Sequence, residues 1–269
     1  IRMAIQHILV AHDLRSTADL ALRRAAQLAR QHKAKLTLLH VSEHHQANAE
    51  RERNEQLLDS SLSRFAPIGS QMRVIRGRAA EVILSQLDEL QPDLLVLGAH
   101  HQRHDLFSGT TLDRIAQGCH IPLLLASIDD DQPYQRALAG LNFSLCACAA
   151  FNKAYQLLPA EAALHALHVL ETPRGQAAQV KEMLETQRLL FEQLLHDETR
   201  NLPANGPSIS HAAQPGQMPA ALQAAINAQQ PQLLVLGCHG RGALSQALLG
   251  SLAQHYLHKA PCDVLVVRQ

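Results

Sequence analysis

The sequence predicts an α/β protein made of two tandem copies of one unit, each with a parallel sheet and helices between its strands. Short apolar runs alternate with stretches in which apolar residues recur at helical spacing, which indicates parallel βαβ units. Residues 92–98 (PDLLVLG) nearly repeat as residues 231–237 (PQLLVLG), late in each half, which indicates an internal duplication. A charged stretch with a proline, Asp129–Pro133, separates the halves, so we expect domains over residues 1–130 and 131–269.

Five apolar runs are expected to form the strands of the first half. They are residues 6–11, 36–41, 72–75, 94–98 and 122–125. Leu58, Leu62 and Phe65 share one face of a predicted helix over residues 46–66. Ser16 and Asp19 resemble a capping box at the start of the helix that follows the first strand.

The second half repeats this pattern with some extra length. Its strands are expected at residues 136–141, 165–169, 209–212, 232–237 and 263–267. Apolar residues between positions 180 and 195 predict a long amphipathic helix, and the loop after it is also longer than in the first half.

Composition excludes several classes of function. The 269 residues carry 24 basic and 24 acidic side chains, so net charge gives no reason for nucleic-acid or membrane-surface binding. Tryptophan is absent, which weakens a role in nucleic-acid binding by base stacking. No apolar run approaches the roughly 20 residues that span a bilayer. Five cysteines, an odd number, and an N-terminus without an export signal predict reduced thiols in a cytoplasmic protein.

A glycine loop follows the predicted strand that ends at residue 237. Gly237 is expected to leave the strand with unusual dihedral angles. Gly240 and Gly242 keep the loop bare, so its N–H groups can approach an anion. Gly250 and Ser251 then open a helix whose N-terminus suits phosphate. The spacing, G-x2-G-x9-G-S, is neither a P-loop nor a dinucleotide fingerprint, and the alternative is a surface loop with no ligand.

This spacing resembles the nucleotide loop of the universal stress protein family, and the ending Pro261–Val267 is similar to that family's last strand. The resemblance covers nearly every element of both halves. It implies a doubly wound, five-stranded, Rossmann-like parallel sheet in each half, as in adenine nucleotide alpha hydrolases, with a pseudo-two-fold axis between them. It also implies ATP or a related adenine nucleotide, with or without Mg²⁺, as the ligand, a role in stress sensing or signalling, and at most slow ATP hydrolysis.

In that family, an Asp after the first strand contacts the adenosine part, the backbone at the end of the second strand holds the base, and the glycine loop holds ribose and phosphates. Carried over to the second half, the resemblance implies contacts from Asn142, Val169, Gly237, Gly240, Arg241, Gly242, Gly250 and Ser251. Asn142 stands at the Asp position, where it can still accept a hydrogen bond but lacks the charge. Arg241 either steadies the phosphates or is a solvated side chain.

In the first half the resemblance implies contacts from Asp13, Val41, Gly98, Gly109 and Thr110. His101 replaces the second loop glycine, and the loop is two residues shorter. Both changes restrict the approach of the backbone to phosphate, so we expect nucleotide binding mainly in the second half.

Histidines, cysteines and the lack of catalytic motifs bear on other possible functions. His100, His101 and His104 form either an exposed polar loop or a metal-responsive site, since imidazole suits Zn, Cu and Ni. Cys146 and Cys148 lack zinc-site spacing and are expected to be small buried apolar groups. We predict no catalytic residue, because no nucleophile elbow or H-E-x-x-H motif is present. The other function class is a scaffold with degenerate pockets that acts through protein partners.

Both halves end in an apolar strand, residues 122–126 and 263–267. An open apolar edge invites pairing, and a linker of about ten residues gives the other copy a high effective concentration. We therefore expect the two final strands to pair antiparallel within one chain, with further homodimerisation left open.

Overall fold

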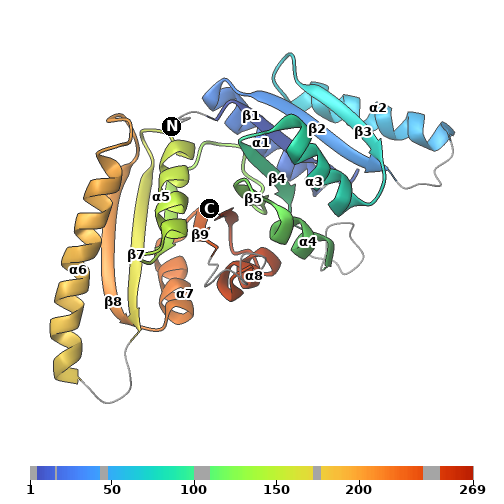
Figure 1. Cartoon of the computed structure of the whole chain (residues 1–269). Helices are drawn as coiled ribbons and strands as arrows, with labels where there is room; N and C mark the ends of the chain where they lie inside the picture. The colour runs from blue at the N-terminus through green and yellow to red at the C-terminus, as the bar shows by residue number, and fades with distance from the viewer. Residues whose placement is uncertain are drawn as a thin grey trace. The chain divides into compact units, whose positions relative to one another are not determined.

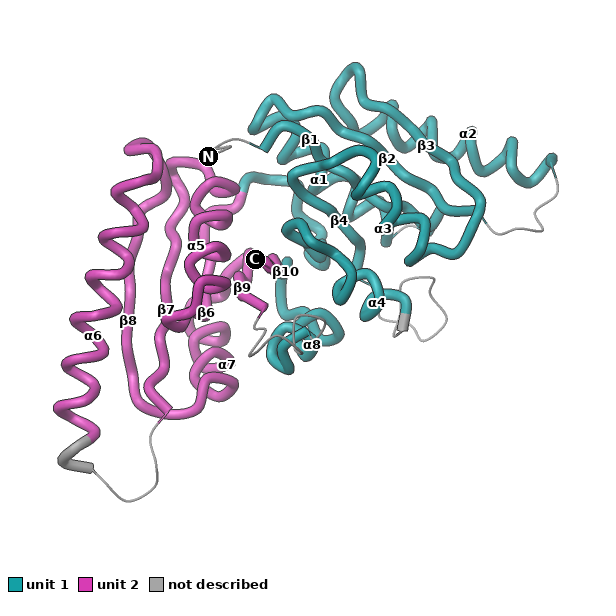
Figure 2. The backbone as a smooth tube through the Cα atoms, viewed as in Figure 1, with its two compact units in different colours: residues 1–133, 240–264 teal, residues 134–239, 265–269 magenta. Residues whose placement is uncertain are grey.

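The computed structural model describes residues 5–15, 17–42, 48–99, 110–171, 177–238 and 249–268. The chain divides into two compact units (Figure 2). The first comprises residues 1–133 and 240–264, and the second residues 134–239 and 265–269. Both are α/β units with parallel strands (Figure 1), which confirms the predicted fold class.

The first unit is built on five parallel strands in the order β3-β2-β1-β4-β5. The strands are β1 (His7–Ala11), β2 (Lys35–Ser42), β3 (Gln71–Arg76), β4 (Leu94–Gly98) and β5 (Leu123–Ala126). The helices are α1 (Ala18–His32), α2 (Asn48–Phe65), α3 (Ala79–Leu90) and α4 (Thr110–Gly118). The chain runs outward from β1 to β3 and then returns to β4, so the strand order reverses between β1 and β4, where open α/β sheets bind ligands.

The helices of the first unit cover both faces of its sheet. Right-handed crossovers that proceed in opposite directions place α1 and α2 on one face and α3 and α4 on the other. In agreement, α1 packs on β1 and β4 and beside α2, whereas α3 packs beside α4. The residue that caps α1 is Thr17, whose side chain makes no capping hydrogen bond, and Ser16 of the predicted capping box lies outside the described residues.

The second unit repeats this plan with the strand order β9-β6-β7-β8. Its strands are β6 (Arg136–Leu141), β7 (Ala163–Glu171), β8 (Ser208–Gly216) and β9 (Leu233–Gly237). Its helices are α5 (Leu145–Leu157), α6 (Ala177–Thr199) and α7 (Met218–Gln229). The end of β10 (Asp263–Val267) also belongs here, since the Cys238 N–H donates to the Val267 carbonyl at 2.9 Å.

Strand β8 is longer than the sequence predicts. It pairs with β7 along nine residues and continues through Pro215 to Gly216. Proline lacks an N–H, but β8 is the last strand in the sheet order, so one of its edges needs no donor. The edge position therefore explains why a proline does not end this strand.

Residues 240–264 belong by sequence to the second half but group with the first unit. They include α8 (Ser251–His258), which contacts the first unit through His258, whose Nε2 lies 2.8 Å from Asp113 Oδ1 of α4. Where the structure describes the chain, none of its helices is both long enough and apolar enough to cross a membrane.

Candidate functional site

Three predicted site residues meet at the carboxyl edge of the sheet in the second unit. The register of β6 with β7 and with β9 continues to the last residues of β6. Asn142 directly follows β6, Gly237 ends β9, and Val169 lies two residues before the end of β7, so all three lie near one edge of the sheet. The sheet thus brings together the residues that were predicted to hold the adenosine part and to begin the glycine loop.

Asn142 forms a local turn that fixes the direction of its side chain. Its Oδ1 accepts the backbone N–H of Ser144 at 3.0 Å, two residues further along the chain. The Ser144 hydroxyl oxygen in turn accepts the N–H of Ala147 at 3.2 Å and caps α5. The first turn of α5 is therefore held directly against the residue that ends β6.

Gly237 is required by packing and not by its backbone dihedral angles. Among the described glycines with positive φ are Gly77 and Gly216, but not Gly237, so the predicted unusual conformation is wrong. A Cβ at Gly237 would lie 2.7 Å from the Cys146 carbonyl oxygen and 3.0 Å from the Ala147 nitrogen. A side chain here would collide with the backbone at the start of α5.

The first unit has the same arrangement, with the carboxylate of Asp13 in place of the amide of Asn142. Asp13 Oδ1 accepts the Arg15 N–H at 3.2 Å, as Asn142 accepts that of Ser144. The Asp13 carboxylate is buried, and the Arg15 guanidinium approaches its Oδ2 to 4.0 Å. Val41 lies one residue before the end of β2 and Gly98 ends β4, and these are the two strands that flank β1.

A buried histidine lies beside each of these edges. His40 Nδ1 is 2.8 Å from the His12 carbonyl oxygen, and His168 Nδ1 is 3.1 Å from that of Leu141. Burial lowers the pKa of His40 below 6.5, so its ring is neutral at pH 7 and donates through Nδ1. Both rings are packed and hydrogen bonded, and each fastens the end of one strand to the next.

The surroundings of these two histidines differ between the units. His168 stacks near two phenylalanines, with ring centroids 4.8 Å from Phe143 and 5.2 Å from Phe191 of α6. Its Nε2 also lies 3.1 Å from Gln187 Oε1. By contrast, none of the described residues hydrogen bonds to the buried Nε2 of His40. The second unit therefore has an aromatic cluster next to Asn142, and Phe143 at its rim is 43% exposed.

Several predicted residues can be placed only in part or not at all. Gly250 precedes α8 and Ser251 is its first residue, which agrees with the predicted helix start. Thr110 is the first residue of α4. Outside the described residues lie Gly109, Gly240, Arg241 and Gly242, and also the histidines of the shorter loop, His100, His101 and His104.

The cysteines of α5 are not the buried apolar groups that were predicted. Cys146 and Cys148 are only partly buried, because α5 presents them beside its exposed first turn. Burial and the neighbouring carboxylate of Glu198 raise the pKa of Cys148 to about 11, so its thiol stays protonated at neutral pH. Within the described ranges, no three His, Cys, Asp or Glu side chains are grouped as metal ligands.

Sequence reasoning missed the aromatic cluster around His168. The available signal was the position of Phe143 directly after Asn142, because a residue there must lie at the edge of the site. Phe191 gave no comparable signal, since the helical pattern marked it only as part of a buried face.

Known proteins of one family share this fold. The profile of the universal stress protein family matches residues 4–127 and again residues 133–268. A search of curated proteins found no match. A universal stress protein from Archaeoglobus fulgidus has a similar structure, with 16% identity, a TM-score of 0.70, and coverage of 97% of this chain and 98% of that one. A putative universal stress protein from Pseudomonas aeruginosa has 19% identity and a TM-score of 0.66, with coverage of 99% and 94%.

Proposed function

Because the chain belongs to the universal stress protein family, we propose that its second repeat binds ATP or a related adenine nucleotide at the edge formed by β6, β7 and β9. Members of this family often bind adenine nucleotides. We further propose that the bound nucleotide changes the conformation of the glycine loop, and that this change serves stress sensing or signalling. Mg²⁺ would accompany ATP as its counter-ion.

The turn at Asn142 is the observation that carries this proposal. Asn142 and Asp13 accept the same hydrogen bond two residues ahead, at 3.0 and 3.2 Å. The substitution of Asp by Asn therefore keeps the shape of the strand end and removes only the charge. An amide at this position still offers both a donor and an acceptor to an adenosine group. Val169, near the end of the neighbouring strand β7, would contribute its backbone to the base.

The glycine loop supplies the second part of the argument. Gly240 and Gly242 have no side chains, and Ser251 begins a helix with free N–H groups, which suits phosphate. In the first repeat, His101 and the shorter loop oppose phosphate binding. We therefore propose that triphosphate binds mainly in the second repeat.

Titration of the full chain with ATP by calorimetry tests this proposal. Gly240→Val should abolish binding, because a branched side chain in the loop blocks the backbone N–H groups from the phosphates. Gly109→Val changes a glycine of the first loop and should leave the affinity unchanged. Circular dichroism should show that both variants keep the wild-type fold. Wild-type affinity in Gly240→Val would contradict the proposal.

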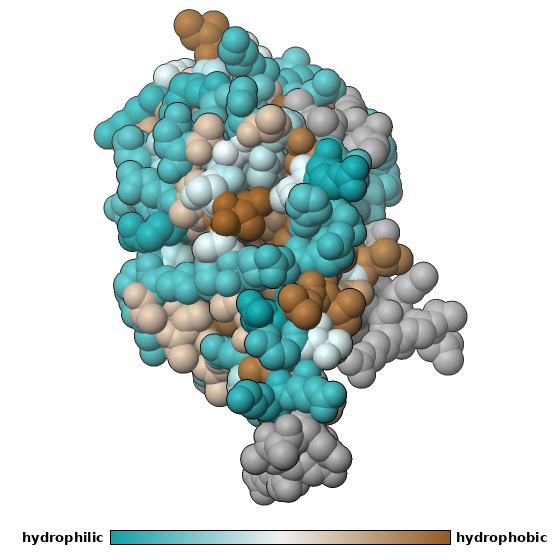
Figure 3. Space-filling view, turned by 90° about the vertical axis from the view of Figure 1, so that its left-hand side faces the viewer, coloured by the Kyte–Doolittle hydropathy of each residue, from teal (hydrophilic) through white to brown (hydrophobic). Residues whose placement is uncertain are grey.

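A scaffold that acts through protein partners is the second candidate. The observation that favours it is the surface of α6, where Met183, Leu189 and Leu190 are about half exposed. Figure 3 looks onto this side of the molecule, where apolar side chains interrupt a mostly polar surface. Mass spectrometry of small molecules released from freshly purified protein separates the two candidates. Protein that carries no nucleotide and binds none at millimolar ATP would favour the scaffold.

A further inference from the structure

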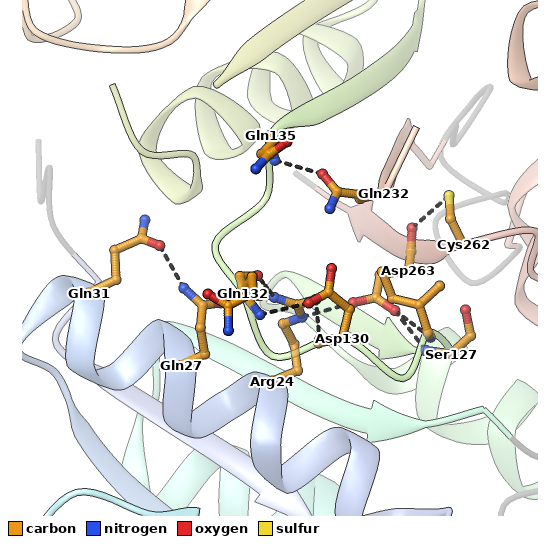
Figure 4. Close-up of polar contacts among 11 residues, drawn as sticks. Arg24, Gln27, Gln31, Ser127, Asp130, Gln132, Gln135, Gln232, Cys262 and Asp263 are labelled. Carbon is orange, nitrogen blue, oxygen red and sulfur yellow. Dashed lines mark hydrogen bonds and ion pairs between the residues drawn. The ribbon is translucent and has the colours of Figure 1, made fainter. Parts of the chain in front are cut away.

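A fully buried ion pair joins two residues that are 239 positions apart in the chain. Arg24 Nε of α1 donates to Asp263 Oδ2 at 3.0 Å, and the two side chains are 1% and 0% exposed (Figure 4). Both residues belong to the first unit. Each charge is costly to bury without the other, so the two must be buried together.

Other polar atoms of the pair bind residues 127–132, the connecting segment between the two halves. The Arg24 guanidinium donates to the carbonyl oxygens of Gln132 at 2.7 Å and Asp130 at 2.6 Å. Asp263 Oδ1 accepts the N–H groups of Ser127 at 2.7 Å and Ile128 at 3.0 Å. Figure 4 shows these contacts converging on the guanidinium and the carboxylate from α1, the connecting segment and the start of β10. The connecting segment is thus fastened from both sides by one pair of charges.

The pair has no counterpart elsewhere in the duplicated sequence. Gly98 packs on Thr17 and Gly237 packs on Cys146, which aligns α1 with α5 and places Lys153 where α1 has Arg24. At the start of β5, the residues Pro122, Leu123 and Leu124 are all uncharged. The final strand of the first half therefore cannot offer a carboxylate to Arg24, whereas the final strand of the second half can.

We propose that α1 carries a docking site for residues 249–264 of the same chain, and that the ion pair between Arg24 and Asp263 is the lock that holds this segment there. The occupant is this segment because it carries the carboxylate that the site requires. His258 adds a contact to Asp113, but that contact is partly exposed and carries less weight. The lock also fixes the connecting segment, since Arg24 donates to two of its carbonyl oxygens and Asp263 accepts two of its N–H groups.

Hydrogen exchange followed by mass spectrometry on the full chain tests the lock. Asp263→Leu and Arg24→Met each leave one buried charge unpaired, so exchange in peptides covering residues 127–132 and 251–264 should rise at least tenfold. Peptides from β7 and β8 should keep their wild-type rates. The double variant Arg24→Met/Asp263→Leu leaves no buried charge, so its exchange in residues 251–264 should return toward the wild-type rate. Residues 127–132 lose their bonds to both side chains in this variant, so their exchange should stay raised.

Two controls keep the result interpretable. Glu55→Gln breaks the partly exposed pair that Arg51 and Glu55 form at 2.8 Å on α2, and it should change exchange in neither segment. Asp263→Asn is the milder change if Asp263→Leu does not fold, because the amide oxygen can still accept the N–H groups of Ser127 and Ile128. Unchanged exchange in residues 251–264 of the single variants, an equal rise throughout the chain, or a purely additive double variant would overturn the proposal.

Discussion

The two repeats have kept the same strand ends and lost different chemical parts. The first repeat retains a buried carboxylate at Asp13 but has His101 in a shortened loop. The second retains the glycine loop but has Asn142 in place of the acid. Both repeats keep the turn after their first strand, and in both a glycine packs against the start of the helix that follows this turn. Contacts that shape the backbone have thus been preserved in both copies, whereas groups that would face a ligand have diverged.

The largest expected difference between the repeats is in the free energy of unfolding when the packing glycines Gly237 and Gly98 are replaced. Gly237→Ala places a Cβ 2.7 Å from the backbone of α5, which must move, so the free energy of unfolding should fall by about 1 to 3 kcal/mol. Gly98→Ala meets Thr17 at 3.2 Å and should cost clearly less. Urea unfolding of both variants measures the difference. Equal losses would show that the two strand ends are not packed as differently as their distances indicate.

A smaller effect is expected from exchanging the acid and the amide. Asn142→Asp restores a charge-assisted hydrogen bond in the second repeat, which is worth about 1 kcal/mol, so the Kd for ATP should fall by roughly fivefold. Asp13→Asn is the matched change in the first repeat and should leave this Kd unchanged. Calorimetric titration of both variants decides the matter. A change of equal size in Asp13→Asn would place the nucleotide in the first repeat instead.

The smallest effect concerns pH and the histidines of the first repeat. Burial lowers the pKa of His40 below 6.5. As the pH falls, the unfolded chain therefore takes up a proton at this residue at a higher pH than the folded chain does. Its contribution to stability is therefore complete above pH 6.5 and is lost as the pH falls through the pKa of the folded state. Burial lowers the pKa of His7 in the same direction. His40→Gln should give a flatter fall in unfolding free energy between pH 7 and 5, and an unchanged slope would contradict this assignment.

Most strands could be predicted from the sequence because each is a compact apolar run bounded by polar residues. The ends were harder, as β8 shows. Pro215 looked like the end of a strand, and only its place at the edge of the sheet explains why pairing continues to Gly216. Edge position depends on strand order, which local sequence does not encode.

The common edge of three predicted site residues could be predicted from the sequence, but the role of Gly237 could not. Asn142, Val169 and Gly237 lie at one edge, as the parallel sheet requires, yet Gly237 serves close packing and not an unusual turn. The pair of Arg24 and Asp263 could not be predicted, because nothing local distinguishes a partner 239 positions away. A charge within an apolar run, as at Asp263, was the available signal that a buried partner must exist.

The lock between Arg24 and Asp263 also bears on how the protein is synthesised. A ribosome reaches Asp263 only 239 residues after Arg24, and the last 130 of these residues follow Pro133, where the first stretch of the first unit ends. At ordinary elongation rates of about 5 to 20 residues per second, those 130 residues take roughly 7 to 26 seconds. Throughout that interval the guanidinium of Arg24 lacks the carboxylate of Asp263 as its partner. The first unit therefore completes its core only after Asp263 has been synthesised.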